Sequence, residues 1–372
     1  MLARGHPLWA EVDLGAIRHN VRTLAARAPG AEVMGVVKGY AYGHGNPEAA
    51  QAMLDAGAGR LGVARVAEAL HLREAGIEAP IQVFTEPPLE AVPTMIGAGV
   101  TPTVYTQRFA EALSAAATEP VAVHLKLDTG MHRVGLPPEE LEGAVRALLG
   151  LPGITIEGVW SHLAVADDPD HPFTRKQLDL FTDLAGQVER AGVALRYRHI
   201  ANSAATLSMP ESHFDLVRCG VASYGLWPGP RLAGTADLRP AMALRARVSM
   251  AKKVPKGDRL SYGLEYELPR TGRVVTVSAG YADGYDRLLS GKADVLIRGR
   301  RHRVSGTVCM DQFMADVGDE DIDVGEVVTL LGSDGAETVP ADELAGHIGT
   351  INYEIVSRVP SRVPRLYVDG GS

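Results

Sequence analysis

The sequence predicts an α/β protein with an N-terminal (β/α)8 barrel of the TIM type and a C-terminal, mostly β domain. Between about residues 30 and 227, eight short apolar runs alternate with amphipathic helical stretches, and eight strands in strict alternation with helices close a barrel. After about residue 240 the pattern changes to short strand-like runs separated by Gly, Asp and Pro. We therefore expect a barrel domain over residues 1–240 and a β domain over 241–372, with the segment up to about residue 12 able to pair with the β domain.

Composition places the chain among ordinary globular proteins. Its 372 residues exceed what one hydrophobic core usually organises, and the 46% hydrophobic and 22% charged fractions exclude a disordered or fibrous chain. A net charge of −8 argues against a nucleic-acid partner, because no basic excess is available to neutralise phosphates. Two cysteines are too few for a disulfide framework. Without a long apolar run or a signal peptide, the sequence predicts a cytoplasmic protein that does not enter a membrane.

The expected barrel strands are apolar, β-branched runs. They cover residues 33–37, 61–64, 81–84, 102–105, 121–125, 154–160, 197–201 and 216–224. The helices between them carry apolar residues at helical spacing and end near Gly, as in 47–58, 66–76, 138–150 and 174–192, and another helix over 13–28 precedes the barrel. An open, doubly wound sheet is the alternative. It usually has fewer strands and a glycine-rich loop after the first strand, where this chain has Lys38.

In the second domain the expected strands cover 243–254, 273–281, 293–299, 302–310 and 326–332. Helical stretches near 342–349 and 353–359 follow them. We expect Cys309 to lie in a buried strand, because it stands between two apolar residues. The histidines lack the helical spacing of a metal site, so we expect no metal.

Polar residues collect at the ends of the barrel strands, where the active sites of such barrels lie. A Lys38 exposed at a strand end has no special chemistry, whereas one desolvated in the barrel mouth has a lowered pKa and can form a Schiff base. After the seventh and eighth strands, small residues offer backbone N–H groups to a phosphate, namely Asn202, Ser203, Gly220 and Val221. A lysine and a phosphate cradle in one barrel mouth indicate pyridoxal 5′-phosphate (PLP).

These motifs resemble the alanine racemase family from about residue 9 to residue 365. In the barrel they are VVKGYAYGHG (36–45), HLKLDTGMHRVG (124–135), SHLAVAD (161–167), ANSAA (201–205) and VRCGVASYG (217–225). In the second domain they are LSYG (260–263), GYADGYDR (280–287), GTVCMDQ (306–312) and TINYEI (350–355). The resemblance implies PLP-dependent racemisation of L- and D-alanine, which supplies D-alanine for peptidoglycan. A serine or broad-spectrum amino-acid racemase is the alternative.

The resemblance also implies roles for the catalytic residues. Lys38 would bind PLP covalently and act as one acid/base group, and Tyr262 would act from the opposite face, since racemisation removes a proton on one side of Cα and returns it on the other. His162 and Arg218 match the residues that link the tyrosine to the pyridine ring. Arg218 would face the pyridine nitrogen, and because a guanidinium keeps its proton, this favours racemisation over transamination. A PLP-dependent decarboxylase would have an acidic residue there instead.

Further residues match positions that bind the cofactor or the substrate. The cofactor phosphate would be bound by Tyr42, Ser203, Gly220, Val221 and Tyr353. Arg133 would reach the phenolic oxygen of the cofactor and the substrate carboxylate, and Lys126 matches a lysine that is carbamylated in many relatives. Substrate contacts would also come from Met310 and Asp311, with Tyr281 at the access channel. In the family Tyr262, Met310 and Asp311 come from the partner chain, which implies a head-to-tail homodimer with shared active sites.

Two departures from the family stand close to the catalytic residues. Gly39-Tyr40 follow Lys38 where Ala-Asn is usual, and Leu163 stands where an aromatic residue is common. We expect the first to affect the tuning of Lys38 without removing a catalytic group. A PLP-binding regulatory protein remains a non-enzyme alternative, although such proteins lack a second domain.

Overall fold

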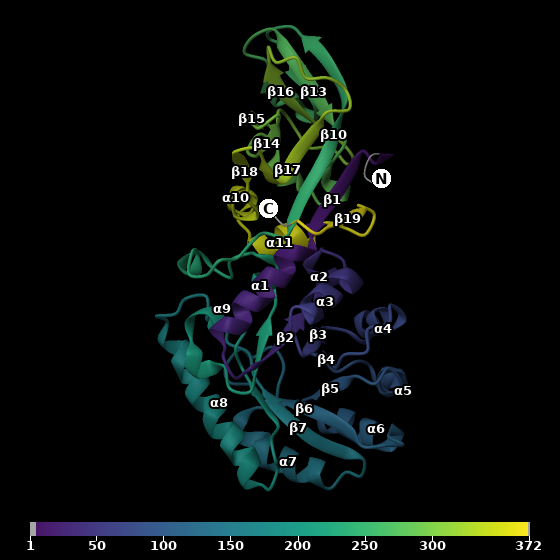
Figure 1. Cartoon of the computed structure of the whole chain (residues 1–372), viewed down its shortest axis with the longest axis vertical. Coiled ribbons are helices and arrows are strands. Elements are labelled where there is room, and N and C mark those ends of the chain that lie inside the picture. Colours follow the sequence, from purple (N-terminus) through teal and green to yellow (C-terminus); the bar gives the residue numbers. More distant parts are fainter. Residues whose placement is uncertain (1–4, 371–372) are drawn as a thin grey trace. The chain divides into compact units, whose positions relative to one another are not determined.

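The computed structural model describes residues 5–370 and forms two compact units (Figure 1). The barrel unit consists of Ala16–Ala41 and Asn46–Arg239. The β unit consists of the chain from Pro240 onward, the described part of the first fifteen residues, and the short segment Tyr42–Gly45. No helix within residues 5–370 is long and apolar enough to cross a membrane.

The barrel unit contains a sheet of eight parallel strands, as the sequence predicts. The strands are β2 (Glu32–Val36), β3 (Arg60–Val63), β4 (Ile81–Val83), β5 (Thr101–Val104), β6 (Val121–Lys126), β7 (Ile154–Trp160), β8 (Tyr197–His199) and β9 (Leu216–Cys219). Their order in the sheet is β8-β7-β6-β5-β4-β3-β2-β9, so that the first and last strands of the barrel are neighbours of one sheet. The backbone N–H of Arg218 in the edge strand β9 donates to the carbonyl of Ala201, two residues beyond the other edge strand β8 (3.1 Å), which nearly closes the barrel.

Helices connect these strands and lie outside them (Figure 1). They are α1 (Leu14–Arg27), α3 (Asn46–Asp55), α4 (Val66–Glu74), α5 (Val92–Gly97), α6 (Gln107–Ala116), α7 (Leu141–Leu149), α8 (Pro172–Arg190) and α9 (Ser203–Ser208). Helix α8 shows why they form: Leu178, Phe181 and Leu184, spaced three residues apart, are buried on one face. Side-chain caps start two others, since the Thr106 hydroxyl caps α6 and the Asn202 amide oxygen caps α9.

The segment after β2 is a turn of the opposite hand, α2 (Lys38–Tyr42). Gly39, Tyr40 and Ala41 have φ of 62°, 56° and 53°, and Tyr42 follows at 51°. A non-glycine residue in this left-handed region costs about 1–2 kcal/mol, so Gly39 is the one member of the turn that adopts it freely. The turn sets where the Lys38 backbone leaves the barrel strand.

The β unit is built on a nine-stranded sheet with the central order β15-β14-β17-β10-β1-β19. Its strands are β1 (Leu8–Asp13), β10 (Met242–Val254), β13 (Gly272–Val277), β14 (Asp294–Ile297), β15 (Arg300–Arg303), β16 (Phe313–Gly318), β17 (Val327–Asp334), β18 (Glu337–Val339) and β19 (Arg365–Val368). Strand β1 pairs antiparallel with β10 and parallel with β19. A small hairpin, β11 (Arg259–Leu260) with β12 (Tyr266–Glu267), and two helices, α10 (Ala341–Ile348) and α11 (Asn352–Ser357), complete the unit.

Three expected strands are wrong in their extent. The strand expected over 273–281 ends at Val277, and Tyr281 begins a 3₁₀ turn. Strand β9 ends at Cys219, and Val221–Tyr224 form a 3₁₀ turn, because Gly220 has φ −106° and ψ −101°, outside the β region. The strand expected over 302–310 ends at Arg303. Beyond it Gly306 has φ +87°, and a Cβ there would lie 3.0 Å from the Leu260 carbonyl oxygen, so the chain forms a loop. Cys309 therefore lies in a loop and is only partly buried.

Candidate active site

The barrel brings together side chains from the carboxyl ends of several strands. Lys38 follows β2, His162 follows β7, Lys126 ends β6, and Arg218 lies in β9. Burial lowers the pKa of Lys38, and the positive charges of Arg133 and Arg218 lower it further. The desolvated lysine in the barrel mouth that the sequence suggests is thus present, and it lies among other cationic groups.

Glu68 anchors the turn that carries Lys38. Its Oε1 accepts a hydrogen bond from the Gly39 backbone N–H (2.6 Å), and its Oε2 accepts from the N–H groups of Ala64 (2.8 Å) and Arg65 (3.0 Å). One carboxylate therefore ties the start of α4 to the left-handed turn. Sequence reasoning missed this residue, although a glutamate at the third position of a helix is a known capping signal.

Arg218 is the most firmly held side chain of the barrel mouth. Its Nη2 donates to the carbonyls of Ser161 (2.7 Å) and Ile200 (3.1 Å) and to Nδ1 of His162 (3.2 Å). Burial lowers its pKa to about 9, so the guanidinium stays protonated at neutral pH. Because Arg218 can only donate, His162 must present a bare Nδ1 and carry its proton on Nε2. The pKa of His162 is well below its usual range, through burial and then the charge of Arg218, and its ring is therefore neutral.

The predicted phosphate cradle consists of small, mostly buried residues where α9 and the 3₁₀ turn begin. The Ser203 hydroxyl accepts from the backbone N–H groups of Gly220 (2.9 Å) and Ala222 (3.4 Å), so the two loops after β8 and β9 are joined. Asn202 supports this loop by capping α9: its side-chain amide oxygen accepts a hydrogen bond from the backbone N–H of Ala205 (3.1 Å). The Ser203 O–H remains a donor for a phosphate group, while the Gly220 N–H would have to leave the Ser203 oxygen to serve as another.

Lys126 is the last residue of β6, and Arg133 lies in the loop that follows this strand. Lys126 is buried, its Nζ donates to the Leu127 carbonyl (2.7 Å), and it lies 5.2 Å from the ring centroid of Trp160. Burial, with a further contribution from Arg218 and Arg133, lowers its pKa to about 7. Arg133, in contrast, is exposed, and its guanidinium is available to a ligand with a carboxylate or a phenolate oxygen. The Trp160 side chain is buried.

The β unit contributes a second group of predicted residues. Tyr262, Tyr281, Met310 and Asp311 line one pocket of about 610 Å³, together with Cys309. Tyr262 is 72% exposed and Met310 54% exposed, which is unusual for large apolar side chains. Asp311 is held by an ion pair with Arg362 (2.8 Å).

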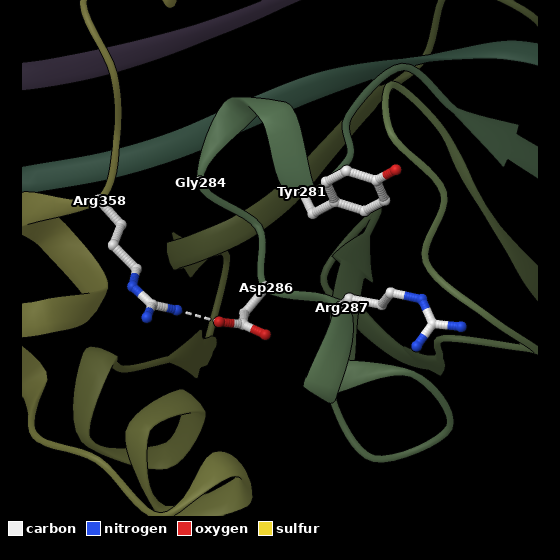
Figure 2. A pocket seen from close by; sticks show the side chains of 5 residues that line it. All are labelled: Tyr281, Gly284, Asp286, Arg287 and Arg358. Atoms are coloured by element: carbon white, nitrogen blue, oxygen red, sulfur yellow. Dashed lines mark hydrogen bonds and ion pairs between the residues drawn. The ribbon is translucent and has the colours of Figure 1, made fainter.

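Tyr281 also faces an adjoining pocket of about 350 Å³ in the same unit (Figure 2). Asp286 and Arg358 form an ion pair on one side of it, and Arg287 extends away from that pair in Figure 2. Arg287 lines both pockets. The cofactor-binding tyrosines expected from the sequence, Tyr42 and Tyr353, lie in the β unit as well, with ring centroids 6.3 Å apart.

No group of three or more His, Cys, Asp or Glu within residues 5–370 could hold a metal ion. The donors of the barrel mouth are instead a lysine, arginines, a neutral histidine and a phosphate cradle. Such a set can bind an anionic, conjugated cofactor and move protons at the lysine amine.

Comparison with known proteins identifies the family. Residues 12–228 match the family model of the alanine racemase N-terminal domain, and residues 241–367 match that of the alanine racemase C-terminal domain. The alanine racemase of Desulfovibrio desulfuricans is 44% identical over 374 residues, which cover 99% of this chain and 100% of the relative.

Solved structures agree with these sequence matches. The alanine racemase of Streptomyces lavendulae is 42% identical with a TM-score of 0.92 and covers 98% of each chain. That of Bacillus anthracis, solved with bound L-Ala-P, is 38% identical with a TM-score of 0.94, covering 99% of this chain and 96% of the other. The fold is that of an amino-acid isomerase. The chain belongs to the alanine racemase family, and its activity is the racemisation of alanine.

Proposed function

We propose that the chain racemises alanine with PLP and with two proton-transferring groups, Lys38 and Tyr262, and that it supplies D-alanine for peptidoglycan in the cytoplasm. The observation that carries the proposal is the environment of Lys38. Burial and two neighbouring guanidinium groups lower the pKa of its amine, which makes the amine available both for covalent attachment and for proton transfer.

The residues present fit PLP. Lys38 would attach the cofactor, Ser203, Gly220 and Val221 would bind its phosphate, and Arg218 would face its pyridine nitrogen. Tyr42 and Tyr353 are the further phosphate ligands that we propose, with Asn202 supporting the loop. When bound, PLP supplies the electron sink that makes the Cα hydrogen of an amino acid acidic.

Each protein group then has a defined task. Lys38 Nζ takes up or returns the proton on one face of Cα, and the Tyr262 hydroxyl does so on the other face. Arg218 would keep its own proton and would not protonate the pyridine nitrogen, which would favour return of the proton to Cα. His162, neutral and held by Arg218, would link this guanidinium to the tyrosine through its Nε2–H. Arg133 binds the substrate carboxylate.

We further propose a head-to-tail homodimer in which Tyr262, Met310 and Asp311 complete the site of the partner. The support is the exposure of large apolar side chains in the β unit, which in a soluble chain marks a surface that another molecule covers. Tyr262 and Met310 are joined there by Leu264 at 53% and Ile351 at 60% exposure. Mixing a Lys38→Ala chain with a Tyr262→Ala chain should restore part of the activity. Heterodimers that form without any activity would show that each site is built within one chain.

We propose that Met310 and Tyr353 limit the size of the substrate side chain, so that alanine is preferred over larger amino acids. The serine or broad-spectrum alternative is not favoured, since the relatives that match the full length of the chain are alanine racemases. Chiral chromatography of a panel of L-amino acids incubated with the enzyme tests this assignment. Faster conversion of serine than of alanine would overturn it.

The cofactor and the two acid/base groups are tested separately. Borohydride treatment of the protein with PLP should fix a pyridoxyl group on Lys38, which peptide mass spectrometry locates; a protein that takes up no PLP ends the proposal. In D₂O, Tyr262→Phe should lose solvent exchange of the α-hydrogen for one enantiomer far more than for the other. Equal residual exchange from both enantiomers would contradict the two-face assignment.

A further inference from the structure

A line of hydrogen-bonded side chains runs through the barrel interior from Arg218. Arg218 Nη1 lies 3.1 Å from Nδ1 of His199, His199 Nε2 lies 2.8 Å from Nδ1 of His124, and His124 Nε2 lies 3.2 Å from Oε2 of Glu157. We call these four residues, Arg218, His199, His124 and Glu157, the histidine line. Both histidine side chains are fully buried, whereas the Glu157 side chain is 20% exposed.

The strand register shows that the line runs along the barrel. His199 of β8 stands opposite Trp160 at the carboxyl end of β7, and His124 of β6 stands opposite Gly158. Glu157 precedes Gly158 and is therefore nearer the amino end of β7. A Cβ at Gly158 would lie 3.0 Å from Cε1 of His124, so the ring depends on a glycine for its space. One end of the line lies in the barrel mouth and the other reaches solvent farther down the barrel.

The direction of every hydrogen bond in the line is determined. A guanidinium only donates, so Nδ1 of His199 must be bare and its proton must be on Nε2. That Nε2–H donates to His124, whose Nδ1 is then bare and whose Nε2–H donates to Glu157. Burial lowers the pKa of both histidines, in agreement with one proton on each ring.

Neighbouring groups keep Glu157 ionised at one end of the line and hold the His199 ring in a fixed orientation near the other. The hydrogen bond from His124 is the main cause that holds the pKa of Glu157 below its usual range, and Arg60 and Arg196 add to it. Arg196 Nη1 also lies 3.4 Å from Oε1 of Glu157. The His199 ring is stacked on Trp160, with centroids 5.7 Å apart and planes 6° from parallel. This ring cannot tilt to find another partner without losing the stack.

We propose that His124 and Glu157 are positioning residues that act on Arg218 through His199. They fix the tautomer in which His199 accepts a hydrogen bond from the guanidinium, and so hold Arg218 in one orientation in the barrel mouth. If the acceptor at Glu157 were lost, the buried Nε2–H of His124 would have no partner, and only the Arg218 end of the line would still favour this tautomer. Part of the protein would then adopt the other tautomers, in which a His199 with a proton on Nδ1 turns an N–H toward an N–H of Arg218. The inference rests on the proposed function, because it is the role of Arg218 toward the cofactor that gives the orientation a consequence.

The tautomers provide a test that needs no activity. We would record side-chain ¹⁵N spectra of the full-length protein labelled at histidine, with and without PLP, and assign the two rings from His124→Phe and His199→Gln. Both rings should be neutral Nε2–H tautomers in either state. An Nδ1–H tautomer or a charged ring at either position overturns the proposal, and this result does not depend on whether the protein racemises alanine.

Variants of Glu157 test the consequence for catalysis. Glu157→Leu removes the acceptor and should lower kcat about tenfold with KM for alanine little changed, and the His199 signals should report mixed tautomers. Glu157→Gln keeps an acceptor oxygen and should retain the wild-type tautomers and most of kcat. Wild-type tautomers and kcat in Glu157→Leu, or an equal loss in Glu157→Gln, overturn the proposal.

The matched control is Tyr197→Phe. Tyr197 packs on the His124 ring with centroids 5.7 Å apart and donates from its hydroxyl to Glu32 (3.2 Å), outside the histidine line. This variant should lower the melting temperature and leave the tautomers and kcat unchanged. If it reproduces the effect of Glu157→Leu, the loss of any hydrogen bond in this part of the barrel is enough to cause it, and the histidine line has no special role. A wild-type enzyme that racemises nothing would refute the proposed function and leave the tautomer test standing.

Discussion

Lys126 is predicted to react with carbon dioxide at neutral pH. Its neutral Nζ would attack CO₂, a C–N bond would form, and one proton would leave the nitrogen for solvent, which gives a carbamate. The side chain would thereby change from a cation to an anion. Arg218 and Arg133, whose charges disfavour the ammonium form, would favour the carbamate, and the new anion would hold the guanidinium of Arg133 in place.

The size of the effect follows from the pKa. With a pKa of about 7, roughly 90% of Lys126 is neutral at pH 8 and roughly 10% at pH 6. An ordinary lysine with a pKa near 10.4 has only about 0.4% neutral amine at pH 8, so the barrel raises the reactive fraction about 200-fold. Because the pKa is lowered, the neutral form is gained as pH rises through 7. Carbamate should therefore form with a midpoint between pH 6 and 8.

The assay is ¹³C NMR of the protein equilibrated with ¹³C-bicarbonate over this pH range. A carbamate signal should appear in the wild type and be absent from Lys126→Arg, whose guanidinium does not react. A signal that rises only above about pH 9.5, the range of an unperturbed lysine, would refute the reasoning, as would one that survives in Lys126→Arg.

Three further predictions concern stability and reactivity. A Cβ at Gly43 (φ +83°) would lie 2.1 Å from a backbone oxygen of α11, while one at Gly39 meets nothing within 4 Å. Gly43→Ala should therefore lose about 3–5 kcal/mol of unfolding free energy in urea and Gly39→Ala about 1–2 kcal/mol; equal losses would contradict this. Glu68→Ala should cost about 1–2 kcal/mol and speed amide exchange at Gly39, and unchanged exchange would refute the anchor. Cys309 should react with maleimide well before Cys219, whose pKa burial raises to about 12; equal rates in the folded protein would argue against this burial.

Most of the fold could be predicted because the sequence patterns that specify its strands and helices are local. Strand and helix periods alternate in the barrel region, and several strands are followed by polar residues at the place where the structure has their carboxyl ends. The errors lie where the backbone conformation of a glycine, and not the pattern of side chains, determines where a strand ends. Gly220 ends β9 early, and Gly306 turns the apolar stretch before Cys309 into a loop, although both stretches have strand-like composition.

The site could be predicted only in part, for a related reason. Lys38, His162 and Arg218 stand at strand ends, which sequence position reveals. Glu68 and the interior partners of Arg218 could not be found in this way. His124 and Glu157 belong to different strands, and their contact depends on the register between β6 and β7, which contains an irregularity between Val123 and His124. No pattern within either strand specifies that register.

The position of β1 has a consequence for how the chain folds while it is synthesised on the ribosome. Both neighbours of this strand, β10 and β19, are synthesised more than 200 residues after it. Most barrel strands, in contrast, pair with the next strand along the chain, and only the β2–β9 pair spans the whole barrel. Leu8–Asp13 therefore remain an unpaired strand until β10 and β19 have been made, and this apolar segment is a place where a nascent-chain chaperone would act.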